Sequence, residues 1–292
     1  MRSIKLLICL LFTGFLHAQT GMEKHFKIYD TRNKQVIPID KIVSDMASAD
    51  VLFFGEEHND SAGHYLENQI FRALHARYGN TIALSLEMFE ADNQLALNEY
   101  LGGFIDESRL AKDTRLWSNY KDYRPMIEYA KQNKIPVIAA NPPRRYVTLV
   151  TRRGMKALDS LDKESKKYLP PLPYDTLGGR YRDKFMDIMK GSPGSSSRNI
   201  YYSQNLWDAG MSYHMYRFHK KNKEKKLFHC VGKFHSDEKL GTAAHLQKKN
   251  KKLRILNISC FPDKSFQNPD WEKFSTLADY VIITDPDLKR TY

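Results

Sequence analysis

The chain has 292 residues, 41% of them apolar, and its formal net charge is +12. This length and composition suit a globular protein with a real core and exclude an intrinsically disordered chain. The positive charge favours anionic ligands or surfaces, although solvated helix ends and turns account for it as well. Nucleic acid is not an expected partner, because the sequence contains no recognition helix, zinc finger or aromatic RNA-binding motif.

The first residues have the pattern of a secretory signal. Arg2 and Lys5 precede an apolar run over 6–16, and we predict a signal peptide over residues 1–19. The run is shorter than the roughly 20 residues that span a bilayer. Cys9 lies inside the run and not directly after it, so a lipid anchor is not expected. We therefore expect an exported protein, periplasmic or secreted.

From residue 50 onward, short apolar runs alternate with amphipathic stretches. Continuous apolar runs are typical of strands buried on both faces, and alternation with helices indicates a parallel sheet. The fold class is therefore predicted as α/β, with a mostly parallel β-sheet flanked by helices. The expected strands are 49–55, 81–88, 135–141, 227–232, 253–259 and 279–285. The expected helices are 61–78, 91–101, 122–133, 204–221 and 240–248.

This alternation stops at about residues 142–203, where Pro, Gly and Ser are frequent and no segment alternates like a strand. We predict one α/β domain over 20–292 with a small helical insertion or cap at 142–203. The segment GSPGSSS within it is expected to be a mobile loop. Cys230 and Cys260 lie in apolar runs, where one disulfide and two buried free thiols both remain open.

Polar side chains follow several of the predicted strands. Glu56 and His58 end the first strand, Glu87 ends the second, Asn141 ends the third, and His235 follows the fourth. In an open parallel sheet, ligands bind outside the carboxyl ends of the strands, so these side chains are expected to converge.

Carboxylate and imidazole side chains suit a divalent metal or general acid–base catalysis. A metal-dependent hydrolase of the esterase or peptidase type is therefore one hypothesis, with Glu56, His58, Glu87 and His235 as metal ligands. The spacing matches no HExxH helix, P-loop, GxSxG or GxGxxG motif, so no catalytic residue is assigned. Capping and turn roles remain the alternative for each of these residues.

Several stretches, taken in order, resemble the ChaN-like haem-binding family, which is grouped with the Tiki, TraB and erythromycin-esterase-like proteins. The stretches are FFGEEHNDSAGHYLENQIFRAL, LSLEMFEADNQLALNEYLGG, DYRPMIEYAKQNKIPVIAANPPR, SQNLWDAGMSYHM and CVGKFHSDEKLGTAAHL. The chain departs from the family pattern in having GKFH where GxGH is common, and Tyr120 where a tryptophan is common.

The resemblance implies a site and a ligand. The polar site carried over by motif consists of Glu56, His58, His64, Glu87, Asn141, Gln204 and His235. The implied cofactor is haem (iron protoporphyrin), bound by an exported, iron-regulated protein for haem or iron acquisition. The implied partners are a second copy of the chain in a homodimer around haem and an outer-membrane haem receptor.

Tyrosine is the iron ligand that the resemblance implies, and the sequence contains 17 tyrosines. A phenolate is an established axial ligand of ferric haem. Tyr123 is the first candidate because it lies in a family motif, and Tyr120 and Tyr202 are the others. Haem binding without chemistry is the favoured hypothesis, hydrolysis is the second, and a binding or structural module acting through its positive surface is the last.

Overall fold

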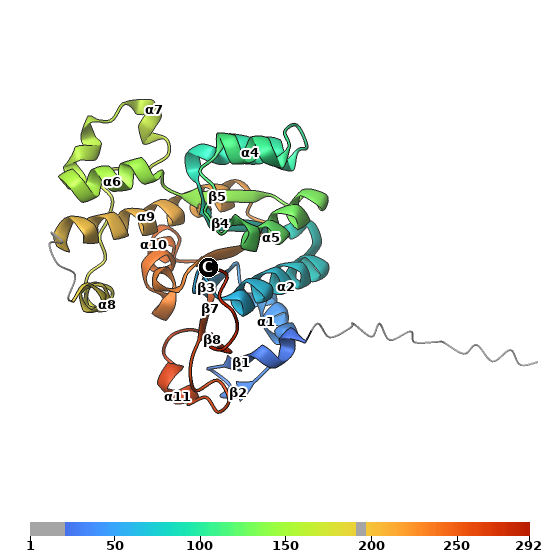
Figure 1. Ribbon diagram of the computed structural model, residues 1–292. Helices are drawn as coiled ribbons and strands as arrows, with labels where there is room; N and C mark the ends of the chain where they lie inside the picture. Colours follow the sequence, from blue (N-terminus) through green and yellow to red (C-terminus); the bar gives the residue numbers. More distant parts are fainter. Residues whose placement is uncertain (1–20, 191–196) are drawn as a thin grey trace, which may run out of the picture.

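The computed structural model describes residues 21–190 and 197–292 (Figure 1). The predicted signal peptide and nearly all of the GSPGSSS segment lie outside these residues. No described helix is long and apolar enough to cross a membrane.

All the predicted strands are present, with boundaries shifted by at most a few residues. The strands are β1 (Phe26–Asp30), β2 (Gln35–Val36), β3 (Val51–Glu56), β4 (Ile82–Glu90), β5 (Val137–Asn141), β6 (Lys226–Gly232), β7 (Ile255–Pro262) and β8 (Tyr280–Thr284). The sequence analysis missed β1 and β2, which are short, partly exposed and antiparallel to their neighbours. Such strands lack the continuous apolar run that marks a buried parallel strand.

The eight strands form one sheet in the order β2-β1-β8-β7-β3-β6-β4-β5. All pairings from β8 to β5 are parallel, which confirms the predicted fold class of a mostly parallel sheet flanked by helices. After β3 the chain moves outward to β4 and β5, and then returns to insert β6 directly beside β3. The ends of β3, β6, β4 and β5 are therefore neighbours.

The helices cover both faces of this sheet (Figure 1). The helices before the insertion are α1 (Ile39–Asp45), α2 (Ser61–Tyr78), α3 (Gln94–Leu101), α4 (Glu107–Asp113) and α5 (Tyr120–Gln132). The later ones are α6 (Arg144–Arg153), α7 (Lys163–Lys166), α8 (Arg180–Met189), α9 (Ser197–Lys221), α10 (Gly241–Lys249) and α11 (Trp271–Phe274). Short 3-10 turns connect them, among them η6 (Lys233–His235) directly after β6.

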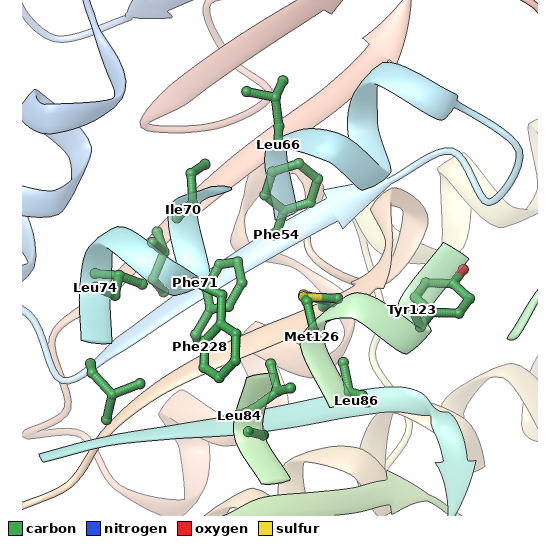
Figure 2. Close-up of a cluster of buried hydrophobic side chains, with 14 of the residues drawn as sticks. Phe54, Leu66, Ile70, Phe71, Leu74, Leu84, Leu86, Tyr123, Met126 and Phe228 are labelled. Atoms are coloured by element: carbon green, nitrogen blue, oxygen red, sulfur yellow. The ribbon is translucent and has the colours of Figure 1, made fainter. Parts of the chain in front are cut away.

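Alternation along β3 divides the core in two, because successive side chains of a strand point to opposite faces. Leu52 and Phe54 pack with α2 and α5 on one face, whereas Val51 and Phe53 pack with α9 and α10 on the other. Figure 2 shows the first face, where Phe71 of α2 stacks on Phe228 of β6 at 6.2 Å between ring centroids. Burial on both faces explains why β3 is apolar at nearly every position.

The start of α2 follows the prediction closely. The Asp60 side chain accepts a hydrogen bond from the backbone N–H of Ala62 and so caps the helix. The same carboxylate accepts a hydrogen bond of 2.6 Å from Thr284 at the end of β8. This cap fixes the turn between β3 and α2, which carries several of the candidate site residues.

The segment after β5 is helical, and it contains α6, α7, α8 and the start of α9 without a described strand. Its small core joins Tyr146, Val150 and Leu158 to Leu206 and Ala209 of α9. Further along the same helix, other residues pack on the sheet. Helix α9 therefore connects the insertion rigidly to the sheet.

The cysteine question left open by the sequence has an answer in the described residues. Cys230 and Cys260 are both buried and both free. They lie on β6 and β7, which are separated in the sheet by β3.

Candidate functional site

The strand ends bring the predicted polar residues together. Glu56 of β3 is in register with Gly232 of β6, and Glu87 lies near the end of β4 on the other side of β6. Asn141 ends β5, the next strand in the sheet, and His235 follows β6 in η6. The convergence follows from the return of β6 into the middle of the sheet.

Glu56 anchors one carboxylate–imidazole pair. Its Oε1 lies 2.6 Å from His58 Nδ1 and accepts a hydrogen bond of 2.7 Å from the hydroxyl of Tyr123. Burial alone raises the pKa of the Glu56 carboxyl, but hydrogen bonds from His58 and His64 outweigh it and hold this pKa well below its usual range. Glu56 is therefore ionised and orients His58 through Nδ1.

Asp208 of α9 anchors a second pair with His235. Its Oδ1 lies 2.7 Å from His235 Nδ1 and accepts a hydrogen bond of 2.8 Å from Thr242, and its Oδ2 accepts one from Tyr181. Burial lowers the pKa of His235, but the charges of Asp208 and Glu87 outweigh it and raise the pKa to about 9. The second imidazole is thus also oriented through Nδ1 by a buried carboxylate.

Glu87 and Gly232 lie between the two pairs. The backbone N–H of Gly232 donates a hydrogen bond of 2.7 Å to Glu87 Oε2, and His235 Nε2 lies 3.9 Å from Glu87 Oε1. A Cβ at position 232 would lie only 2.9 Å from His58 Nε2. A larger residue here would require the imidazole of His58 to shift, because that ring packs directly against the backbone of Gly232.

A pocket of about 620 Å³ opens beside this arrangement. It is within the size range of small-molecule sites. The predicted residues in its wall are His58, Glu87, Asn141 and His235. Other residues in the wall that the sequence did not indicate are Arg115, Trp117, Arg144 and Trp207.

Gln204 faces another space. It lines a separate pocket of about 580 Å³ together with Glu56, His58 and His235. Its amide nitrogen lies 3.3 Å from the hydroxyl of Tyr181 and 3.3 Å from His235 Nδ1. Gln204 therefore supports the Asp208–His235 pair from the side of the insertion.

His64 lies deeper, behind Glu56. Its Nδ1 is 3.3 Å from Glu56 Oε2 and 3.0 Å from Glu67 Oε2. Burial lowers the pKa of His64, but the hydrogen bonds that it donates to these carboxylates outweigh burial and raise the pKa to about 11. Glu67 was missed by the sequence reasoning, although its position three residues after His64 on a helix places both on one face.

The four residues that the sequence predicts as metal ligands are not the ones whose ligand atoms form a compact group in the structure. Among the described residues, the group whose ligand atoms all lie within 4.8 Å of one another is Glu56, His64 and Glu67. His58, Glu87 and His235 lie around the pocket instead, and only Glu56 is common to both sets. Spacing along the chain could not separate these arrangements, because Glu56 faces His58 with one oxygen and His64 with the other.

The tyrosines expected to bind iron occupy three different environments. Tyr123 is fully buried, with its hydroxyl on Glu56, and Figure 2 shows its ring beside Met126 in the core. Burial raises the pKa of its phenol, which opposes formation of a phenolate. This environment is unfavourable for an iron ligand, because the hydroxyl is buried and engaged by Glu56, and the choice of Tyr123 as first candidate stays a prediction.

The other two candidates differ in access. Tyr120 is half-buried and packs its ring against Phe89 at 6.3 Å, and burial also raises its pKa. Tyr202 is half-buried on α9 and borders two pockets of about 470 and 500 Å³ in the insertion. Its hydroxyl accepts a hydrogen bond of 2.8 Å from Arg198 Nε.

Taken together, the fold and this site define a parallel α/β protein with paired carboxylates and imidazoles at the carboxyl edge of its sheet and a helical insertion beside it. The family model described as "Haem-binding uptake, Tiki superfamily, ChaN" matches residues 42–246. The chain belongs to this family.

One solved structure supports the fold. The chain is similar to ChaN of Campylobacter jejuni, described with cofacial haem binding, at a TM-score of 0.68 and 20% identity over 90% of this chain and 98% of that one. An erythromycin esterase mutant in its open conformation aligns at a TM-score of 0.48 and 11% identity, over 89% and 83% of the two chains. The second similarity is too low to support an argument.

A curated relative matches only in part. Protein RETICULATA-RELATED 5, chloroplastic, of Arabidopsis thaliana is 29% identical over 119 residues. The alignment covers 39% of this chain and spans 16% of that relative.

Proposed function

We propose that this protein binds ferric haem and serves in haem or iron acquisition. Membership of a haem-binding uptake family, with a model match over 42–246, supports haem as the ligand. The observation that carries the proposal is the position of Tyr202, which borders two pockets and has a guanidinium beside its hydroxyl.

The surroundings of Tyr202 suit an apolar ring with anionic substituents. Arg153 and Arg198 line one of its pockets, and Arg182 lines the other together with Arg198. These guanidiniums match the carboxylates of haem propionates in charge and geometry. Leu172 and Pro173 supply apolar wall. In this arrangement Tyr202 would hold the iron, and haem would supply the iron centre that the protein carries.

The test is a titration of the purified protein with ferric haem, followed by absorption spectroscopy. Wild type is expected to give a saturable spectrum with a high-spin tyrosinate charge-transfer band. Tyr202→Phe is expected to lose the band and to bind at least about tenfold more weakly, a loss of about 1.4 kcal/mol. Tyr168→Phe, another half-buried tyrosine of the insertion, serves as the matched control.

Two outcomes would change this proposal. Loss of the band in Tyr123→Phe or Tyr120→Phe, with the band retained in Tyr202→Phe, would move the ligand to the sheet side of the molecule. Weak haem binding that never saturates in wild type would reject haem as the ligand.

We also propose export through residues 1–19 and assembly of a homodimer around haem, with an outer-membrane haem receptor as partner. The signal-like composition of the N-terminal residues supports export. Determining the N-terminus of protein recovered from outside the cytoplasm tests it, and an intact Met1 would reject it. Sedimentation with and without haem tests the dimer, which requires the mass to double on haem addition.

A hydrolase is the second candidate, favoured by one specific observation. Glu56 and Asp208 each orient an imidazole through Nδ1, which leaves His58 Nε2 and His235 Nε2 directed toward the region of Glu87. An imidazole oriented in this way can act as a general acid while it is protonated, or as a metal ligand once it has lost that proton. Screening esters and peptides with wild type and His235→Ala tests this role, and equal rates for both would reject it.

A further inference from the structure

Glu56, His64 and Glu67 form a buried group, of which neither proposed function uses His64 or Glu67. Glu56 is 2% exposed, His64 is 6% exposed and Glu67 is 0% exposed. Glu56 ends β3, and His64 and Glu67 lie in the first two turns of α2. The charges of this buried group are removed from water and therefore need internal compensation.

The hydrogen bonds of His64 determine which of its nitrogens is free. Nε2 lies 3.1 Å from the carbonyl oxygen of His58, which can only accept a hydrogen bond, so Nε2 carries a hydrogen. In the neutral imidazole, the lone pair of Nδ1 then points at Glu56 Oε2 and Glu67 Oε2, at 3.3 and 3.0 Å. Three electron-rich atoms meet there, so a proton or a metal cation must lie between them.

Two further observations favour a metal ion over a single proton. Glu67 Oε1 is buried and has no hydrogen-bond partner, and Glu56 Oε2 has only His64 Nδ1 beside it, at 3.3 Å. The ligand atoms of Glu56, His64 and Glu67 also all lie within 4.8 Å of one another. One proton forms a good hydrogen bond with one acceptor, whereas a metal ion can contact all three ligands at once.

We propose that Glu56, His64 and Glu67 bind a divalent metal ion of the zinc or manganese class. One imidazole and two carboxylates are ligands that such ions accept. Ligand atoms about 2.0–2.2 Å from one ion lie roughly 3.3 Å apart in a tetrahedron, which matches the distances observed around Nδ1. The carbonyl of His58 holds the other nitrogen of His64, as is usual for metal-binding histidines.

This metal would have a positioning role. Glu56 would contact it through Oε2 while its Oε1 remains on His58 Nδ1. The ion would thus join α2 to β3 and set the orientation of His58, without contacting a ligand in the pocket. Because the site is buried, the metal is expected to enter during folding and to exchange slowly.

The first test needs no variant and no haem. The full chain is unfolded in EDTA and refolded with Zn²⁺, with Mn²⁺ or with EDTA, and bound metal and Tm are measured after dialysis. We expect about one ion per chain and a Tm higher by at least about 5 °C than in EDTA. Equal Tm values in all three samples, with no metal retained, would overturn the proposal and leave protonated His64 as the compensating charge.

Variants locate the ion. Glu67→Gln is expected to lose the metal, whereas Glu57→Gln is expected to keep it. Glu57 is the matched control because it neighbours Glu56, is partly exposed and pairs with Lys233 at 3.4 Å. Metal lost in His235→Ala but kept in Glu67→Gln would assign the ion to the pocket and overturn the proposal. Neither result depends on haem, so failure here leaves the proposed function untouched.

Discussion

At the carboxyl edge of the sheet, Glu56, His58 and His235 are held by strand ends and buried hydrogen bonds. In the helical insertion, Tyr202 is half-buried beside Arg198 and borders open pockets. The first region has charges that compensate one another, and the second has cations that face a cavity. The comparison teaches that buried carboxylates and imidazoles can neutralise one another, whereas guanidiniums that line a pocket remain available to an anionic ligand.

Of the predicted variants, Glu56→Ala has the largest expected effect, and it tests whether the two regions are independent. The change removes the acceptor of Tyr123 and the partner of His58 and His64. We expect the free energy of unfolding to fall by about 3–5 kcal/mol, because buried partners lose their counter-charge. Chemical denaturation measures this change.

The same variant separates the two regions. Its haem spectrum below the denaturation transition is expected to match that of wild type. If haem binding disappears while the protein stays folded, haem binds at the carboxyl edge of the sheet and not in the insertion.

The pH dependence of stability is the next largest effect. The pKa of His235 is about 9 in the folded protein, above the ordinary value of 6.5, because Asp208 and Glu87 favour its charged form. Its stabilisation is therefore complete below about pH 6.5 and is lost as the pH rises through about 9, with a maximum of about 3 kcal/mol.

Denaturation at a series of pH values between 6 and 10 checks this sign. Wild type should lose more stability over that range than His235→Gln, which cannot titrate at this position. Parallel curves for the two proteins would show that the Asp208–His235 pair contributes nothing in this range.

Gly232→Ala has the smallest expected effect and tests how closely His58 packs at the carboxyl edge of the sheet. The new Cβ would lie 2.9 Å from His58 Nε2, but His58 is partly exposed and can shift. We expect a loss of about 1 kcal/mol, at the low end for overpacking. Any hydrolytic activity should fall while haem affinity stays constant, and an unchanged His58 resonance in NMR spectra would contradict the expected shift.

Much of the edge could be predicted from the sequence for a simple reason. Strands buried on both faces have continuous apolar runs, and the residue after each run must lie at the carboxyl edge. The apolar runs alone therefore predict that Glu56, His58, Glu87 and His235 lie near one another. Strands β1 and β2 were not predicted, because a partly exposed antiparallel edge lacks such a run.

The sequence by itself determined the parallel α/β class, the helical character of the insertion and the set of polar residues at the strand ends. The tertiary structure alone decided which of them pair, because β6 inserts between β3 and β4 and α9 brings Asp208 to His235. It also decided that Tyr123 is buried on Glu56 and that Tyr202 borders a pocket. Burial and access depend on contacts between segments far apart in the chain, and local patterns do not contain that information.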